Sequence, residues 1–452
     1  MSDNYNVQSH KKRLRIIILT ATLVLIAALI VCGVIAAIIK KNSPPTTKEQ
    51  LMANVSEGIP KNAYNVMTAL KKWDFPDFDG ETLSKIEYFY QHLYYTEIES
   101  HETLAAKTAE IFIDEYYESI DLKDKSDVTN ALASSYISAV GDRYGVYRDS
   151  EENEIYEQDL SGHTVGIGVI ISKNHDGNIL VKSLVRGAPA ESAGIKASDV
   201  IVAVDGTRVS TIGYKEATDR IRGKIDTKLT VTILRGDKES DITVTRKKFE
   251  DVTVNYEMLG GSVGYISIER FKGNTAKQFV NAIDTLVRDG AVGIIFDLRS
   301  NPGGLLRSVS DILSYIVPTG TEIASFSNGK PPMKATHGTE LEPTDNVYTL
   351  PSVVLVNSST ASAAELFAAA MRDFGEMELL DVTVVGKTTF GKGVMQTTVD
   401  FPAGASLTLT VARYNAPLGE NYDGIGVIPS STVKDGENAI EHSTQVLLDM
   451  IE

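Results

Sequence analysis

From about residue 250 onward, strand-like and helix-like segments alternate, and this alternation constrains the fold more than any other feature. "SVGYISIERF" is predicted as a strand and "TAKQFVNAIDTLVRDG" as a helix, and "AVGIIFDLRSNPGGLL" is predicted as a buried strand that runs into a glycine turn. A helix follows in "RSVSDILSYIV", and "PSVVLVNSSTASAAELFAAAMRDF" supplies another strand and helix. Alternating strands and helices are joined by crossovers and form a largely parallel sheet. The sequence therefore predicts an α/β domain over residues 250–452.

The turns after two of these strands carry the polar residues of interest. Sites in parallel sheets gather at the carboxyl ends of the strands, where both "NPGG" and "NSSTAS" lie. Ser362 falls where a strand breaks into a helix, between the small residues Ala361 and Ala363, so its hydroxyl can be presented as a nucleophile, although the Gly-x-Ser-x-Gly pattern is absent. The spacing of Ser362 and Glu365 also fits a helix capping box. The stretch alone leaves both interpretations open.

A serine nucleophile needs a base, and the segment "VVGKTTFGKGVMQTTV" offers one. Lys392 lies between two glycines, and burial can lower the pKa of such an amine towards neutrality. Gln396 follows four residues later and can orient the amine without a charge. An exposed turn with a solvated lysine is the alternative. Of the seven histidines, only His337 in "KATHGTE" is kept as a rival base. "GKTT" lacks the upstream glycine of a phosphate-binding loop.

Residues 160–247 resemble a PDZ domain. The resemblance rests on "HTVGIGVII" followed by "GAPAESAGIKASDVIVAVDGTRV". The stretch Gly166, Ile167, Gly168 and Val169 can present backbone amides to a C-terminal carboxylate, and a bound peptide would extend the sheet edge. "YKEATDRIRG" is expected to be the helix that flanks this groove. A plain hairpin with its turn at Asp205-Gly206 is the simpler alternative.

The beginning of the chain predicts a membrane anchor. Residues 16–39 contain no charge, and at ~1.5 Å per residue a helix of this length can cross a core of roughly 30 Å. The basic cluster before this span places residues 1–15 in the cytoplasm and the part of the chain after the span outside it. Residues 40–150 are predicted as a linker and a helical N-terminal domain. The only cysteine, Cys32, falls in the span, so the rest of the chain has no disulfide.

Charge and residue types also limit the classes of binding partner that the chain can have. The formal charge of −16, with a basic N-terminus, leaves an acidic body that makes nucleic acid an unsuitable partner. No metal site and no cofactor is predicted. The expected partners are protein or peptide substrates and the membrane, and the sequence leaves a homo-oligomer open.

Four stretches together resemble the carboxyl-terminal processing peptidases, also called tail-specific proteases. They are "FDLRSNPGGLL", "NSSTASAAELFAAAM", "GKTTFGKGVMQ" and "LTLTVARYNAPLGENYDGIGVIP". The resemblance covers about residues 128–435 and implies Ser362 as nucleophile, Lys392 as general base and Gln396 as the residue that positions the lysine. It further implies an oxyanion hole at the amides of Ala363 and of Gly303 or Gly304, and it assigns an activating role to Arg222 in the PDZ region. Departures occur at Ala364, at "GDRYGVY" and at Pro429-Ser430.

The predicted fold class is multidomain α+β: an N-terminal transmembrane helix, a helical region, a PDZ-like β domain and an α/β, crotonase-like serine peptidase domain. The predicted function is that of a membrane-anchored serine endopeptidase. Its PDZ domain would recognise the C-terminal tails of substrates, and a Ser-Lys dyad would cleave them. The alternative is a catalytically inactive, membrane-anchored PDZ adaptor that binds such tails.

Overall fold

The computed structural model describes residues 47–185, 187–336 and 350–452. The described chain divides into two compact units. The smaller unit contains the described residues up to Tyr88 together with Glu99–Gly141, and the larger contains Phe89–Ile98 and Asp142–Glu452. Each unit is described by itself.

The smaller unit is helical, as the sequence predicts for this region. Its helices are α2 (Lys48–Ser56), α3 (Val66–Lys72), α4 (Gly80–Leu93, which continues into the larger unit), α5 (His101–Ile111), a π-helical turn (Phe112–Tyr116) and α6 (Lys125–Val140). Asp124 caps α6 through its side chain, and Gly141 ends it in the left-handed conformation. Buried side chains such as Leu70, Leu104 and Leu132 form the core.

The predicted fold class needs correction at its N-terminus. The segment predicted to span a membrane, 16–39, lies outside the described residues. Within the described parts of the chain, no helix combines the length and the apolar character that crossing a membrane requires. Even α6 has only 16 residues, or about 24 Å at 1.5 Å per residue, against a hydrocarbon core of roughly 30 Å. We therefore correct the fold class to multidomain α+β without a described transmembrane helix, and we withdraw the predicted membrane location.

The PDZ-like region consists of a sheet, two helices and a pair of strands. Its sheet has the order β3-β4-β5-β7-β8, with β6 paired to β5. The strands are β3 (Val169–Lys173), β4 (Ile179–Leu184), β5 (Val200–Val204), β6 (Thr207–Arg208), β7 (Lys228–Arg235) and β8 (Lys238–Thr245), and the helices are α8 (Pro189–Ser192) and α9 (Val209–Ile221). The separate pair β2 (His163–Gly166) and β9 (Lys247–Glu250) lies at the two ends of this region in the sequence. Because β3 is an edge strand, its outer side is available for a further strand.

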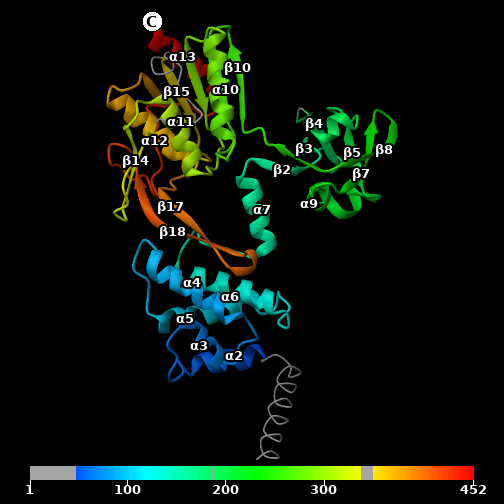
Figure 1. The fold of residues 1–452 in the computed structure, drawn as a ribbon, viewed down its shortest axis with the longest axis vertical. Coiled ribbons are helices and arrows are strands. Elements are labelled where there is room, and N and C mark those ends of the chain that lie inside the picture. The colour runs from blue at the N-terminus through cyan, green and yellow to red at the C-terminus, as the bar shows by residue number, and fades with distance from the viewer. Residues whose placement is uncertain (1–46, 186, 337–349) are drawn as a thin grey trace, which may run out of the picture. The chain divides into compact units, whose positions relative to one another are not determined.

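A six-stranded sheet forms the centre of the α/β region (Figure 1). Its order is β10 (Val254–Leu259), β11 (Val263–Ile268), β12 (Gly293–Asp297), β15 (Ser352–Val356), β16 (Val382–Gly386) and β19 (Ser431–Thr432). All neighbours are parallel except β10 with β11. The predicted largely parallel sheet is confirmed, with one antiparallel strand at its edge.

Helices cover both faces of this sheet because alternate strand residues point to opposite sides. Ile294 and Phe296 pack in the core that contains α10 (Thr275–Arg288), α11 (Leu306–Ile316) and α12 (Ala363–Glu376). Ile295, between them, packs in the smaller core that contains Leu447 of α13 (Ala439–Ile451). Both faces of these strands are therefore buried, and their sequences are continuous apolar runs.

A second, antiparallel sheet completes the larger unit. It contains β1 (Val146–Arg148), β13 (Glu322–Phe326), β14 (Met333–Lys334), β17 (Val394–Asp400) and β18 (Ser406–Asn415). A short 3₁₀ turn (Pro402–Gly404) joins β17 to β18, and α7 (Ser150–Leu160) follows β1. The long strand β18 pairs with β1, β13 and β17.

Candidate active site

The carboxyl ends of three neighbouring parallel strands bring the sequence motifs together. Strand β12 is followed by the "NPGG" turn, β15 by "NSSTAS", and β16 by the segment that contains Lys392. Backbone bonds connect the three turns. The N–H of Ala361 donates to the carbonyl of Asn301 at 2.9 Å, and the N–H of Phe390 donates to the carbonyl of Thr360 at 2.9 Å. The sheet topology alone therefore places Ser362 between the other two motifs.

Ser362 occupies a sharp corner between β15 and α12. Its φ of 58° and ψ of −123° lie in a region that L-residues seldom adopt. The N–H of Glu365 donates to the carbonyl oxygen of Ser362 at 2.8 Å. The Glu365 carboxylate in turn accepts from the N–H of Ser362 at 2.8 Å, so the glutamate reaches back to the backbone as in a capping box. Small residues on both sides, Ala361 and Ala363, leave room around it.

Gly303 packs directly against this corner. A Cβ at Gly303 would lie 2.8 Å from both the carbonyl oxygen of Ala361 and the Cβ of Ser362, and its φ is +98°. A side chain there would push the two turns apart as well as strain the backbone. The glycine thus sets the distance between the "NPGG" turn and the corner at Ser362.

The first prediction concerns this close approach. Gly303→Ala is expected to lower the free energy of unfolding by about 3 kcal/mol or more, since it adds a steric overlap to the cost of a positive φ. Gly290→Ala is the matched control, because Gly290 has a φ of +92° and no atom within 4 Å of its Cβ position. That control should cost only about 1–2 kcal/mol. Urea unfolding of both variants measures the difference, and equal losses would contradict the close-packing argument.

Glu365 connects the corner at Ser362 to the segment that contains Lys392. Its side chain is fully buried and accepts four hydrogen bonds. The donors are Ser362 N at 2.8 Å, Thr389 Oγ1 at 2.5 Å, Gly391 N at 2.6 Å and Lys392 N at 2.8 Å. One carboxylate therefore fixes the backbone at Ser362 relative to that at Lys392, as a buried carboxylate with all acceptor positions used can do.

The Lys392 amine is oriented by Gln396 and Tyr144. Lys392 Nζ donates to Gln396 Oε1 at 2.7 Å, and Gln396 Nε2 donates to the carbonyl oxygen of Tyr144 at 2.5 Å. Gln396 lies at a bulge in the β17–β18 ladder, which turns its side chain out of the regular strand alternation. No hydrogen bond joins Lys392 Nζ to Ser362 Oγ among the described residues. That contact would have to form on the way to proton transfer, as is common for sites without substrate.

Burial lowers the pKa of Lys392. Removal of the amine from water is the largest cause and disfavours the charged form, whereas Asp142 and Glu365 act in the opposite direction. A lysine with a lowered pKa is neutral over a wider range of pH, and only the neutral amine can accept a proton. The exposed, solvated lysine that the sequence left open is therefore not what the structure contains at this position.

The backbone N–H groups near Ser362 differ in whether they already donate a hydrogen bond within the protein. Gly303 N–H already donates to Asn301 Oδ1 at 2.8 Å, and Asn301 is itself fully buried and donates to the carbonyl of Ile268 at 2.9 Å. The turn is further held by Phe271, whose N–H donates to the Gly303 carbonyl and whose carbonyl accepts from Leu305 N–H. Of the two glycines, Gly304 is therefore the better candidate to donate to an oxyanion, together with Ala363 at the start of α12.

The predicted peptide-binding stretch runs from the last residue of β2, Gly166, to the first residue of β3, Val169. The carbonyls of Ile167 and Gly168 accept from Ala190 N at 2.7 Å and Val185 N at 3.0 Å, so both point into the domain. Gly168 has a φ of +79°, and a Cβ there would lie 2.1 Å from the Cβ of Ala188. Helix α9 includes most of the predicted groove helix, and Arg222 lies exposed at its C-terminal end. The rival base His337 lies outside the described residues.

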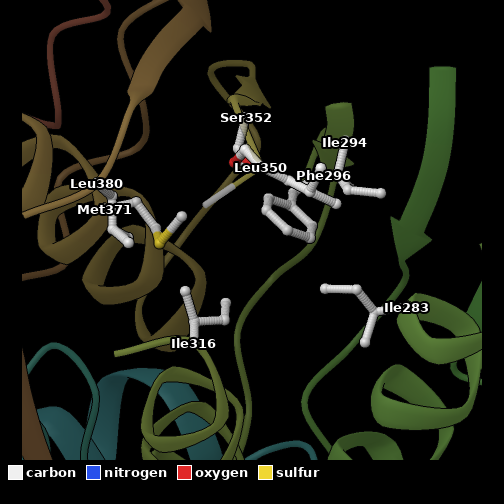
Figure 2. A pocket seen from close by; sticks show the side chains of 8 residues that line it. All are labelled: Ile283, Ile294, Phe296, Ile316, Leu350, Ser352, Met371 and Leu380. Carbon is white, nitrogen blue, oxygen red and sulfur yellow. Dashed lines mark hydrogen bonds between the residues drawn. The ribbon is translucent and has the colours of Figure 1, made fainter. Parts of the chain in front are cut away.

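A small cavity lies away from these motifs, in the core between the sheet and its helices (Figure 2). Its volume is about 10 Å³. It is lined by Ile283, Ile294, Phe296, Ile316, Leu350, Ser352, Met371 and Leu380. The only polar side chain drawn, Ser352, donates to the carbonyl of Leu350 at 3.1 Å. This apolar hollow is a packing defect and has no groups for chemistry.

Sequence reasoning missed two tyrosines at the site. Tyr144 contacts both Lys392 and Gln396, and the buried Tyr414 donates from its hydroxyl to the Lys392 carbonyl at 3.0 Å. Burial is the main cause that raises the pKa of Tyr414, and a hydrogen bond with Ser362 partly opposes it. No spacing rule points to either residue. Two signals were available: "GDRYGVY", which contains Tyr144, departs from the family pattern, and Tyr414 lies in one of the four stretches that resemble the family.

Two parts of the sequence match known protein families. Residues 262–433 match the model of Peptidase family S41, and residues 157–234 match that of the PDZ domain. The chain is 37% identical over 319 residues to the carboxy-terminal processing protease CtpA of Bacillus subtilis (strain 168), and 32% identical over 316 residues to a probable CtpA-like serine protease of Staphylococcus aureus (strain N315). These matches cover 70% and 69% of this chain, and 65% and 61% of the two relatives' length.

A solved structure shares the fold. It is a putative S41 protease from Bacteroides fragilis, with 15% identity and a TM-score of 0.50, and the match covers 81% of this chain and 97% of that one. At this identity the similarity concerns the fold alone. Within the described part of the chain, no group of three or more His, Cys, Asp or Glu side chains is arranged to hold a metal ion.

Proposed function

Because this chain belongs to the carboxyl-terminal processing peptidases, peptidase family S41, we propose that it is a serine endopeptidase with a Ser362-Lys392 dyad. The observation that carries the proposal is the buried Glu365 carboxylate, which binds the backbone N–H of both Ser362 and Lys392 and so holds the two segments in one site. Both residues lie at the carboxyl ends of adjacent parallel strands, where such sites are found.

In the proposed reaction, neutral Lys392 removes the hydroxyl proton of Ser362 while Oγ attacks the scissile carbonyl. The protonated lysine then gives a proton to the leaving amine, and water hydrolyses the acyl-enzyme with the lysine again as base. Gln396, which is neutral and bonded to Nζ at 2.7 Å, orients the amine without stabilising its charge as a carboxylate would. The amides of Gly304 and Ala363 would donate to the oxyanion, whereas the Gly303 N–H first has to leave Asn301.

The PDZ domain is proposed to bind the C-terminal tail of the protein substrate. The stretch Gly166–Val169 would hold the terminal carboxylate by its amides, and the tail would add a strand to the free edge of β3 beside α9. Specificity for particular tail residues would come from side-chain pockets along this edge. Arg222, exposed at the end of α9, is retained as a proposed activating residue.

The test combines a serine-reactive fluorophosphonate with a peptide library. The full chain is incubated with peptides of common sequence that differ in their C-terminal residues. Cleavage that depends on the tail, together with labelling of Ser362, supports the proposal. Tight peptide binding with neither cleavage nor labelling would favour the inactive adaptor instead.

A further prediction concerns the pH dependence of cleavage. The base works only when neutral, so kcat/KM should rise with pH through the pKa of Lys392 and level off above it. Because burial lowers this pKa below its usual value of 10.5, the rise should be complete at a lower pH than for an exposed lysine. A pH–rate profile measures this. A rise of kcat/KM centred near pH 6.5 would instead indicate that a histidine is the base.

A further inference from the structure

We infer that Tyr144 is a positioning residue for the base, whose ring covers the Lys392 amine and whose backbone carbonyl fixes the glutamine that orients it. The inference deepens the proposed function, because it concerns the same dyad. Nothing in the sequence motifs assigns a role to this residue.

Two contacts converge on Tyr144. The Lys392 Nζ lies 4.3 Å from the centre of the Tyr144 ring, well within the range of a cation–π contact. The Tyr144 carbonyl accepts from Gln396 Nε2 at 2.5 Å, and Gln396 Oε1 accepts from Lys392 Nζ at 2.7 Å. The ring and the carbonyl of one residue thus contact the amine directly and through Gln396.

Tyr144 is itself held in place by buried groups. Its N–H donates to Asp142 Oδ1 at 3.2 Å, and Asp142 accepts from the N–H and the hydroxyl of Thr410 at 3.0 and 2.7 Å. Asp142 also accepts from the hydroxyl of Tyr90 at 3.0 Å. These bonds fix the backbone of Tyr144 to β18, the strand that pairs with the one carrying Gln396. The ring therefore has a rigid support.

The surroundings of the amine contain several charged or titratable groups from different segments. They are Asp142, Arg143, Glu365, Tyr414 and Asp423. Asp142 and Glu365 favour the charged amine. The Arg143 guanidinium lies 5.4 Å from the centre of the same Tyr144 ring. Asp423 accepts from Gly393 N, and Tyr414 donates to the Lys392 carbonyl. A change of the Tyr144 side chain removes the contact with Arg143, whereas the hydrogen bonds of Asp423 and Tyr414 go to other residues.

The ring has two opposing effects on the amine. It excludes water, which disfavours the ammonium form, and its face attracts the ammonium form. Substitutions separate the two. Phenylalanine keeps an aromatic ring that both excludes water and attracts the ammonium form. Leucine still excludes water but has no aromatic ring, and alanine does neither. Removal of water is the largest cause of the lowered pKa of Lys392, so the exclusion of water is expected to dominate.

The experiment measures the titration of Lys392 without any substrate. The full chain and its variants are labelled with acetic anhydride at a series of pH values, and mass spectrometry of the Lys392 peptide reports the neutral amine. In Tyr144→Phe, the pKa of Lys392 should equal that in the wild type. In Tyr144→Leu it should be about half to one pH unit lower, because the aromatic ring that attracts the ammonium form is lost. In Tyr144→Ala it should be about one pH unit higher, because water reaches the amine.

Tyr256→Ala is the matched control, since Tyr256 is a half-exposed tyrosine on β10. It should leave the titration unchanged. Identical titration of Lys392 in all Tyr144 variants, or a lowered pKa in the alanine variant, would overturn the inference. Labelling of Ser362 by the fluorophosphonate is measured separately. If Lys392 responds as expected but Ser362 is never labelled, the positioning role stands and the proposed peptidase function fails.

Discussion

Ser362→Ala lowers the rate of peptide cleavage by at least about a thousand-fold, because in the proposed mechanism the acyl-enzyme forms on the Ser362 hydroxyl. The fold should be retained. Alanine meets the same backbone strain at a φ of 58° as serine does, and the bond from the backbone N–H at this position to the Glu365 carboxylate does not involve the hydroxyl. Cleavage of a tail-containing peptide, followed by mass spectrometry, measures the loss, and circular dichroism checks the fold.

The same turn and the same loop provide the controls. Ser359→Ala alters an exposed serine three residues earlier and should leave cleavage unchanged. Lys392→Met should abolish cleavage as Ser362→Ala does, whereas Lys387→Met, which alters a half-exposed lysine of the same loop, should not. If Ser362→Ala retained more than a tenth of the wild-type rate, or if Lys387→Met matched Lys392→Met, the dyad would be wrong.

Glu365→Gln produces the second large effect, on stability and activity together. The carboxylate accepts four hydrogen bonds at 2.5–2.8 Å and is fully buried. An amide of the same size would direct an NH₂ group at backbone N–H donors and leave them unpaired. We expect a loss of about 3–5 kcal/mol in the free energy of unfolding, as for other broken buried charged networks. Cleavage should fall by about a hundred-fold, since displacements of the order of 1 Å cost that much.

Glu376→Gln is the matched control for this prediction. Glu376 lies at the other end of α12 and its side chain is largely exposed. Its substitution should change the free energy of unfolding by no more than about 0.5 kcal/mol. Urea unfolding and cleavage rates are measured for both variants. Equal stability of the two would show that the Glu365 contacts do not hold the corner to the base segment.

Much of the α/β region could be predicted from sequence, because its signals are local. Apolar runs such as "SVVLV" end at glycine or serine turns, and that pattern alone indicates buried strands followed by helices. Because sites in parallel sheets gather at the carboxyl ends of the strands, Ser362 and the "NPGG" turn are then expected at one edge of the sheet. The spacing of Ser362 and Glu365 predicted that the glutamate reaches back to the backbone, and this contact is confirmed.

Contacts between distant residues could not be predicted in this way. The bond from Gln396 to Tyr144 joins residues 252 positions apart, and no periodicity carries such information. Glu365 was recognisable as a helix cap, but its bonds to Gly391 and Lys392 depend on how the loop after β16 folds. The predicted transmembrane helix depended on hydrophobicity alone, in a segment that the described structure does not include.

The pairing of β1 with β18 defines what a self-sufficient catalytic fragment must contain. Val146 and Arg148 align with Thr408 and Ser406, although the PDZ region lies between β1 and β10 in the sequence. The PDZ region is therefore an insertion between two segments of the chain that share one sheet. A fragment that begins at residue 250 lacks an outer strand, Asp142 and Tyr144. Because Phe89–Ile98 belong to the same unit and the Tyr90 hydroxyl donates to Asp142, boundaries for expression or domain exchange belong before α4. The paired strands β2 and β9 mark the two points at which the PDZ region could be excised.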